Sequence, residues 1–407
     1  MFHQLLDVAS AHRAANSSSA AVVHALHPST TTKHYLGVRA CYAQCIAALQ
    51  MGCDTKRLGC ENMSGEPSIP KGHDRCHDAA MTIGPATSPS DALARHQAGA
   101  VSATLNIGLV AVVLAVALSF VSGSTAMSAQ APTWVLPIAI IALAVGVPHG
   151  ALDHLTLRQA LTLRQFAVLA LGYTLIAGLG AAAIIAAPVP AFIVVVAFTV
   201  WHFGTGDVEA TSSLQGKAPE RGFPRVVLAL ALGSAPVLLP LTSPASAATL
   251  ELIEPQLGQL LTPAVIVVVR TTVFIVIAVA LAILVKRHQL RGALELVALT
   301  ALGCLASPLL AFAVYFGLWH ALRHTARLAQ YTYGYVSAKT IALTFRRGLP
   351  ALIGFIIVVG ILAFRSSSFT LSGSWLWLGL ALVWGLTIPH MVFVAAFDRR
   401  GRSASVR

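Results

Sequence analysis

Charge is scarce in this sequence. Only 10% of its 407 residues are Asp, Glu, Lys or Arg, against 56% that are hydrophobic, whereas a soluble globular domain carries roughly a quarter charged residues. Apolar runs of about twenty residues recur between Val101 and Phe397, and each is long enough to cross a bilayer as a helix. These runs exclude a soluble protein with a single anchor. They predict an all-α fold, a polytopic bundle of transmembrane helices over residues 100–397.

Cysteine is almost missing from the apolar region. Five of the six cysteines lie in the first 95 residues, which are polar and rich in Ser, Thr and His. Their spacings match no standard pair of zinc ligands, and no charged start, apolar core and cleavage site follow one another as in a signal peptide. We interpret residues 1–95 as a disordered extension or as the product of a mis-assigned start codon, since Met81 opens a short polar leader before the first apolar run.

The apolar region divides into about ten predicted spans. They cover roughly residues 101–121, 133–150, 165–187, 189–205, 224–241, 263–285, 291–306, 308–327, 348–366 and 375–397. With this count, seventeen Lys and Arg residues lie in the even-numbered connections and the tail 398–407, and only Arg365 lies in an odd-numbered connection. Lys and Arg collect in cytoplasmic loops. Both termini are therefore predicted on the cytoplasmic side of the cell (inner) membrane, and the net charge of +12 needs no nucleic-acid partner.

Histidines interrupt four of the apolar spans. Seven histidines lie beyond residue 100, and one of them, His288, is in a basic loop. The other six form four motifs: PHGALDH (His149, His154), WHFGTGD (His202), LWHALRH (His320, His324) and IPHMVF (His390). In the predicted topology all four motifs lie near the cytoplasmic ends of their spans. Because ionisable groups at membrane depth are costly and face the bundle interior, we predict that these histidines meet in one buried site.

The residue type and spacing of these histidines point to a metal. Imidazole is the commonest metal-ligating side chain, and His320 and His324 are four residues apart, so they share one face of a helix. His149 and His202 complete an economical set of four. His154 follows His149 by five residues, so on a continuous helix its side chain points away from a site that His149 joins, unless the helix ends first. His390 is a fifth candidate, predicted just outside the set of ligands.

Two aspartates accompany the histidines, and two interpretations of them stay open. Asp153 and Asp207 either accept hydrogen bonds from imidazole N–H groups or lie at helix ends near the cytoplasmic interface. The metal is also open at this point, since imidazole suits iron, copper, zinc and nickel. The sequence contains no H-E-x-x-H motif of zinc proteases.

The four motifs, in this order, resemble those of the Brp/Blh family of membrane carotene oxygenases. The resemblance covers about residues 100–397. It implies an integral membrane iron enzyme that cleaves β-carotene at its central 15,15′ double bond with O2 and yields two molecules of retinal. It also implies that Fe2+ is held by His149, His202, His320 and His324. The lipid bilayer would hold the substrate, and a functional link to a retinal-binding rhodopsin is a further expectation.

A hydrophobic polyene substrate needs an apolar path to the metal. Phe203, inside the motif WHFGTGD, and Tyr315, three residues before LWHALRH, are the first candidates for the walls of a substrate tunnel, although aromatic side chains in a bundle also serve simply for packing. Three other functions remain alternatives: a di-iron desaturase or hydroxylase, for which no H-x-x-H-H box is found, a haem cytochrome with two histidine ligands, and a transporter with a histidine proton relay.

Overall fold

The structure, a computed structural model, describes residues 89–123, 125, 134–156, 162–365 and 374–404. Residues 1–88, most of the predicted extension, lie outside the described residues. The first described helix begins at Pro89, so residues 89–95 belong to this helix. The last helix continues to Ala404 and so includes most of the predicted basic tail.

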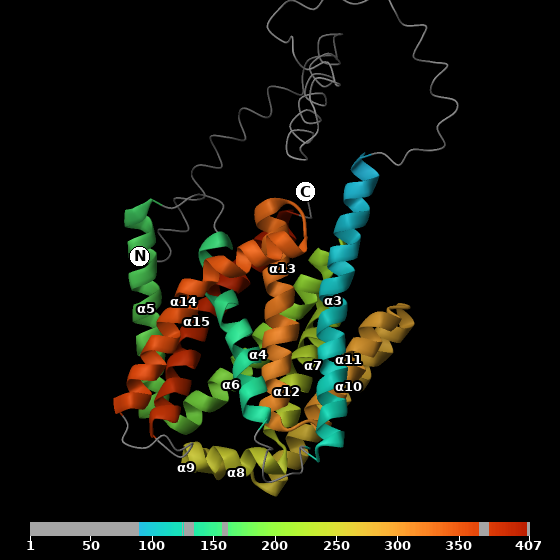
Figure 1. Cartoon of the computed structure of the whole chain (residues 1–407). Coiled ribbons are helices and arrows are strands. Elements are labelled where there is room, and N and C mark those ends of the chain that lie inside the picture. Colours follow the sequence, from blue (N-terminus) through green and yellow to red (C-terminus); the bar gives the residue numbers. More distant parts are fainter. Residues whose placement is uncertain (1–88, 124, 126–133, 157–161, 366–373, 405–407) are drawn as a thin grey trace, which may run out of the picture. The chain divides into compact units, whose positions relative to one another are not determined.

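The described residues are almost entirely helical. In chain order the helices are α3 (Pro89–Val121), α4 (Val135–Gly150), the short η4 (Asp153–Thr156), α5 (Leu163–Ala186), α6 (Pro188–Leu214), α7 (Gly222–Leu241), α8 (Pro244–Ile253), α9 (Pro255–Gly258), α10 (Pro263–Lys286), α11 (Leu290–Leu305), α12 (Pro308–Val314), η5 (Tyr315–Ala321), α13 (Leu322–Tyr333), α14 (Ala338–Arg365) and α15 (Ser374–Ala404). Helix α15 packs along α5, and α6 packs along α7 (Figure 1). The predicted all-α class is confirmed.

Seven helices among the described residues are long and apolar enough to cross a membrane. They lie within α3, α5, α6, α7, α10, α14 and α15. Large apolar side chains are exposed along several of them, for example Leu171 and Leu179 on α5, as expected for surfaces that face lipid rather than water. The remaining predicted spans coincide with α4 and α11, which have 16 residues each, and with the stretch 308–333, which a π-helix divides. The ten-span count and the cytoplasmic termini therefore stay predictions.

Proline begins several helices at positions where the sequence expects tight connections. Only Ala187 separates α5 from α6, which starts at Pro188, and two residues separate the end of α11 at Leu305 from α12, which starts at Pro308. Proline suits the first turn of a helix because its missing N–H group has no partner there in any case. Short connections of this kind keep consecutive helices antiparallel neighbours.

Glycines bring the histidine motifs close to their neighbours. A Cβ atom on Gly204, two residues after His202, would collide with the backbone carbonyl of Ala229 on α7. A Cβ atom on Gly317, three residues before His320, would collide with the carbonyl of Ala142 on α4. Small residues allow such close helix contacts in membrane bundles. Gly204 lets α6 pack closely on α7, and Gly317 brings η5, which carries His320, close to α4, which carries His149.

Candidate metal centre

Five histidines from separate helices lie together inside the bundle. His149 is near the end of α4, His202 is in α6, His320 is in η5, His324 is in α13 and His390 is in α15. Each is only 2–5% exposed. The structure thus brings together the four residues of the predicted ligand set and the fifth candidate.

The imidazole rings are spaced as neighbours around one point. The centroid of the His390 ring is 5.1 Å from that of His149 and 5.0 Å from that of His202, and the His202 and His320 centroids are 5.4 Å apart. Two rings that share an ion through nitrogens at about 2 Å have centroids roughly 4.5–6.3 Å apart. The rings are nevertheless not closed on one ion, since no three His, Cys, Asp or Glu groups among the described residues form a compact ion-binding group. The nitrogens would need to draw together on binding.

The Nε2 atom of every ring in this cluster is buried and without a partner among the described residues. Nine buried side-chain nitrogen and oxygen atoms of the described residues have no hydrogen-bond partner, and five of them are the Nε2 atoms of the five histidines. Native proteins satisfy most buried polar atoms. Five unsatisfied imidazole nitrogens in one place are therefore a donor set that fits a metal with a preference for imidazole.

Acceptors on the opposite ring nitrogens orient three of these histidines. Nδ1 of His320 lies 2.9 Å from Oδ1 of Asp207, and Nδ1 of His390 lies 2.9 Å from Oδ1 of Asp153. Nδ1 of His149 faces the carbonyl oxygen of Gly146. An acceptor at Nδ1 keeps the proton there and leaves the lone pair of Nε2 for a metal, an arrangement typical of ligating histidines.

Asp207 is held in place by two further donors. The hydroxyl of Tyr315 and the indole N–H of Trp319 each donate to Oδ2 of Asp207 over 3.0 Å. Three donors thus converge on one buried carboxylate, which suits a charge in a region of low dielectric constant. Tyr315, a candidate tunnel residue from the sequence, contacts the centre through Asp207.

Asp153 reaches the cluster because α4 ends at Gly150. The chain then turns into η4, which starts at Asp153, and the hydroxyl of Tyr173 on α5 donates to Oδ2 of Asp153 over 3.2 Å. His154 follows in η4, but its side chain lies outside those that the structure describes. The predicted helix therefore stops before His154, which was the condition on which its orientation depended.

A π-helix carries His320. The segment Tyr315–Ala321 has the wider π turn between two α-helical segments, a feature that is often found at functional sites. His320 and His324 still lie on one side, with ring planes 10° apart and centroids 6.4 Å apart. On α6, a Cβ atom on Gly206 would be 3.0 Å from Cε1 of His320, so this glycine leaves room for the ring. The sequence showed the glycine and the histidine but gave no signal for the π turn.

Phenylalanine rings line one side of the cluster. The ring of Phe203 lies 4.5 Å from that of His320, and the ring of Phe316 lies 5.2 Å from that of His149. Phe312 stacks on Phe316 at a centroid distance of 5.8 Å. Phe203, a predicted tunnel residue, is thus in direct contact with the histidines, within an apolar aromatic wall.

Buried arginine–carboxylate pairs flank the histidines, and the sequence alone did not predict them. The guanidinium of Arg323 lies 3.1 Å from Glu295 on α11 and 3.6 Å from the centre of the Trp319 ring. Nη1 of Arg327 lies 2.6 Å from Oδ1 of Asp398 on α15. The motif LWHALRH contains one arginine, Arg323, directly before His324, but only the fold reveals its distant partner.

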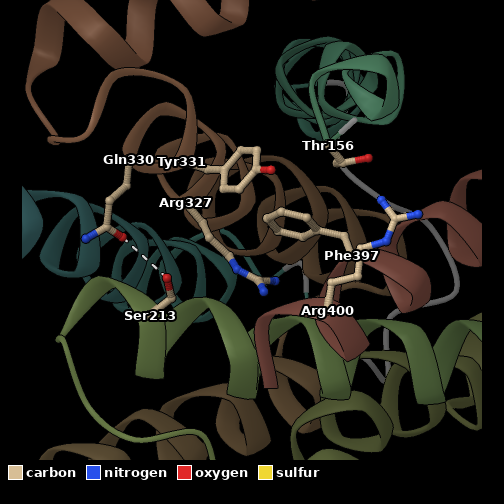
Figure 2. Close-up of a pocket in the computed structure, with 7 residues that line it drawn as sticks. All are labelled: Thr156, Ser213, Arg327, Gln330, Tyr331, Phe397 and Arg400. Carbon is tan, nitrogen blue, oxygen red and sulfur yellow. Dashed lines mark hydrogen bonds between the residues drawn. The ribbon is translucent and has the colours of Figure 1, made fainter. Parts of the chain in front are cut away.

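A cavity of about 200 Å³ adjoins Arg327 and does not include the histidines. It is lined by Thr156, Ser213, Arg327, Gln330, Tyr331, Phe397 and Arg400 (Figure 2). Its link to the centre is indirect, since the hydroxyl of Thr156 donates to the backbone carbonyl of Asp153 over 2.6 Å. The cavity is lined by none of the five histidines, so we do not place the reaction there.

Apolar helices around a buried cluster of imidazoles define a helical membrane protein with a histidine-rich centre. The family model described as beta-carotene 15,15'-dioxygenase matches residues 140–398, the stretch that contains all five histidines. The chain belongs to this family, and the resemblance inferred from the four motifs is confirmed.

A curated relative is similar over about half of the chain. The protein described as "Probable beta-carotene 15,15'-dioxygenase Blh" of Halobacterium salinarum is 28% identical over 232 residues, which are 53% of this chain and 67% of that protein. No solved structure matches the chain. The arrangement of the histidines therefore comes from this structure alone.

Proposed function

We propose that the chain is an iron-dependent β-carotene 15,15′-dioxygenase. Membership of the family supports the carotene-cleaving reaction. The observation that carries the proposal is the set of buried Nε2 atoms without a partner among the described residues. They offer neutral nitrogen ligands in an apolar interior, which suits a transition metal and a hydrocarbon substrate together.

His149, His202, His320 and His324 would hold the iron in this proposal. Bound iron would supply the redox chemistry that lets O2 react with a carbon–carbon double bond. In the overall reaction the central double bond of β-carotene breaks and each of its two carbons gains one oxygen atom. One carotene and one O2 thus give two molecules of retinal, so no external reductant is needed.

The protein's own part in the reaction is positioning. Asp207 holds the ring of His320 through the 2.9 Å contact at Nδ1. The rings of Phe203 and Phe316 lie against the imidazoles and offer an apolar surface on which a polyene can lie while water is excluded. Fixing the central bond next to the reactive centre removes much of the entropic cost of bringing the reactants together.

The same proposal places the protein in the cell membrane with its metal centre toward the cytoplasmic side. The Lys and Arg distribution of the sequence supports this orientation. A carotenoid resides in lipid, so the bilayer is the natural source of the substrate. The product, retinal, is the chromophore of rhodopsins, which supports a functional link to such a protein.

Expression in a bacterium that accumulates β-carotene tests the proposal. We expect the orange colour to fade and retinal to appear in a ratio of about two per carotene lost, measured by chromatography of cell extracts. Two matched strains serve as controls. The strain with His320→Ala is expected to keep its β-carotene, and the strain with His288→Asn is expected to lose it as the strain with the natural sequence does.

Unchanged pigment in cells that contain inserted, iron-loaded protein would contradict the proposed reaction. The absorption spectrum of the purified protein separates the alternatives, because a haem cytochrome shows a Soret band and the proposed site does not. Metal analysis separates a histidine proton relay, which needs no stoichiometric iron.

A further inference from the structure

We infer that His390 is a fifth ligand of the same metal and that Asp153 is the carboxylate that orients it. The inference rests on the proposed iron function and deepens it. It departs from the interpretation of His390 as a residue beside the ligand set. The structural feature behind it is the position of the His390 ring within the cluster.

His390 is among the most central rings of the five. Its ring centroid lies 5.0 Å from that of His202 and 5.1 Å from that of His149, the two shortest separations between histidine rings of the cluster. Its separation from His324 is 6.0 Å, less than the 6.4 Å between His320 and His324. A metal shared by the four predicted ligands is therefore within reach of the fifth ring.

The surroundings of His390 repeat those of His320. Each ring places Nδ1 2.9 Å from one carboxylate oxygen, Asp153 for His390 and Asp207 for His320. Each ring also leaves a buried Nε2 without a partner in the described residues. A carboxylate behind a ligating histidine sets its tautomer and makes it more basic. If this arrangement identifies His320 as a ligand, it identifies His390 as one too.

A tyrosine holds the Asp153–His390 pair to two helices. The hydroxyl of Tyr173 on α5 lies 3.2 Å from Oδ2 of Asp153 and 3.3 Å from the carbonyl oxygen of Leu386, one turn before His390 on α15. The three elements α5, η4 and α15 thus meet at this carboxylate. A histidine that served only for packing would not need its second nitrogen left free in so constrained a position.

The test measures iron binding rather than turnover. Full-length protein in lipid nanodiscs is loaded with Fe2+, and its affinity is determined by competition with a chelator. We expect His390→Gln to weaken iron binding by more than about tenfold and Asp153→Asn by about 10–100-fold, the usual effect of removing a carboxylate behind a ligand. X-ray absorption at the iron edge should show one histidine nitrogen fewer in His390→Gln.

His320→Ala and His288→Asn are the matched controls, one inside and one outside the cluster. Helical circular dichroism and a single elution peak establish that each variant is folded. If His390→Gln does not fold, His390→Ala with added free imidazole serves instead, and recovery of iron binding by imidazole supports a ligand at this position. Failure of imidazole to restore binding in folded His390→Ala counts against it.

The outcomes separate this inference from the function on which it rests. If the natural sequence binds one iron and His320→Ala loses it, while His390→Gln keeps the same affinity and the same nitrogen count, then His390 is not a ligand and the proposed function stands. If the natural sequence binds no stoichiometric iron under any loading condition, the proposed function and this inference both fail.

Discussion

Two groups of buried polar side chains adjoin in this protein, and they differ in how they are satisfied. The first group, called here the arginine–carboxylate layer, consists of two ion pairs between different helices, Arg323 with Glu295 and Arg327 with Asp398. In the histidine cluster, three rings have an acceptor on one nitrogen, yet all five leave Nε2 without a partner among the described residues.

This difference distinguishes buried polar residues that stabilise the fold from those that are available to bind a ligand. A buried ion pair compensates its own desolvation only when both charges are present. In this layer each arginine charge has its carboxylate within the protein, although Nε and Nη2 of Arg323 lack a hydrogen-bond partner among the described residues. In the histidine cluster the atoms without a partner are Nε2 of all five rings, and ring nitrogens are the atoms through which imidazole binds a metal. Polar groups that the protein itself does not satisfy are the ones to test for a ligand, and the following predictions test this distinction.

The largest effect is expected for His320→Ala. It removes one of the five Nε2 atoms without a partner and leaves Asp207 facing no imidazole. We expect iron affinity to fall by more than about 100-fold, beyond the usual effect of a residue behind a ligand, with no retinal formed. Iron per chain after gel filtration measures it. Retention of full iron content by the folded variant would show that His320 is not needed to hold the metal.

Glu295→Gln tests the other group. It leaves the buried guanidinium of Arg323 without its carboxylate, and breaking such a pair costs about 3–5 kcal/mol of stability. We expect a clear drop in the midpoint of thermal unfolding, with an unchanged iron content in the molecules that remain folded. Specific loss of iron at unchanged stability would show that the layer is part of the metal centre.

Asp207→Asn should lower iron affinity by less than His320→Ala does. The amide keeps an acceptor for His320 but removes the charge on which three donors converge. A loss of about 10–100-fold in iron affinity, equivalent to about 1.4–2.8 kcal/mol, is expected from chelator competition. An effect as large as that of His320→Ala would mean that Asp207 itself contacts the metal.

The smallest effect is expected for His288→Asn, outside both groups. His288 has a φ angle of +56°, a left-handed conformation that asparagine tolerates better than alanine. We expect stability to change by less than about 0.5 kcal/mol and iron content to stay the same. A loss of iron here would show that metal retention reports general damage rather than the cluster.

Particular residues show how far the sequence reached. The apolar runs predicted helices in the right parts of the chain, but α3, α6 and α14 extend well beyond the predicted spans 101–121, 189–205 and 348–366. The four motifs led to the family and to His149, His202, His320 and His324. Asp207 was a candidate partner of an imidazole, but its choice of His320 depends on the contact between α6 and η5. The π turn at Tyr315–Ala321 has no pattern of its own in the sequence.

His390 shows the limit most clearly. Following Pro389, it was predicted at the margin of the site, whereas the centroid of its ring lies 5.1 Å from that of His149 and 5.0 Å from that of His202. Side-chain spacing within one helix can be calculated from the helical period, but the distance between residues on different helices depends on how close those helices pack.

The amino-acid sequence alone determined the helical membrane class and the chemistry of the side chains, because hydrophobic length and residue type are properties of local sequence. The tertiary structure decided which imidazoles face one another, which carboxylate stands behind each ring and where each buried arginine finds its anion. These depend on contacts between segments far apart in the chain, such as Asp153 with His390, and only the packed helices bring such segments together.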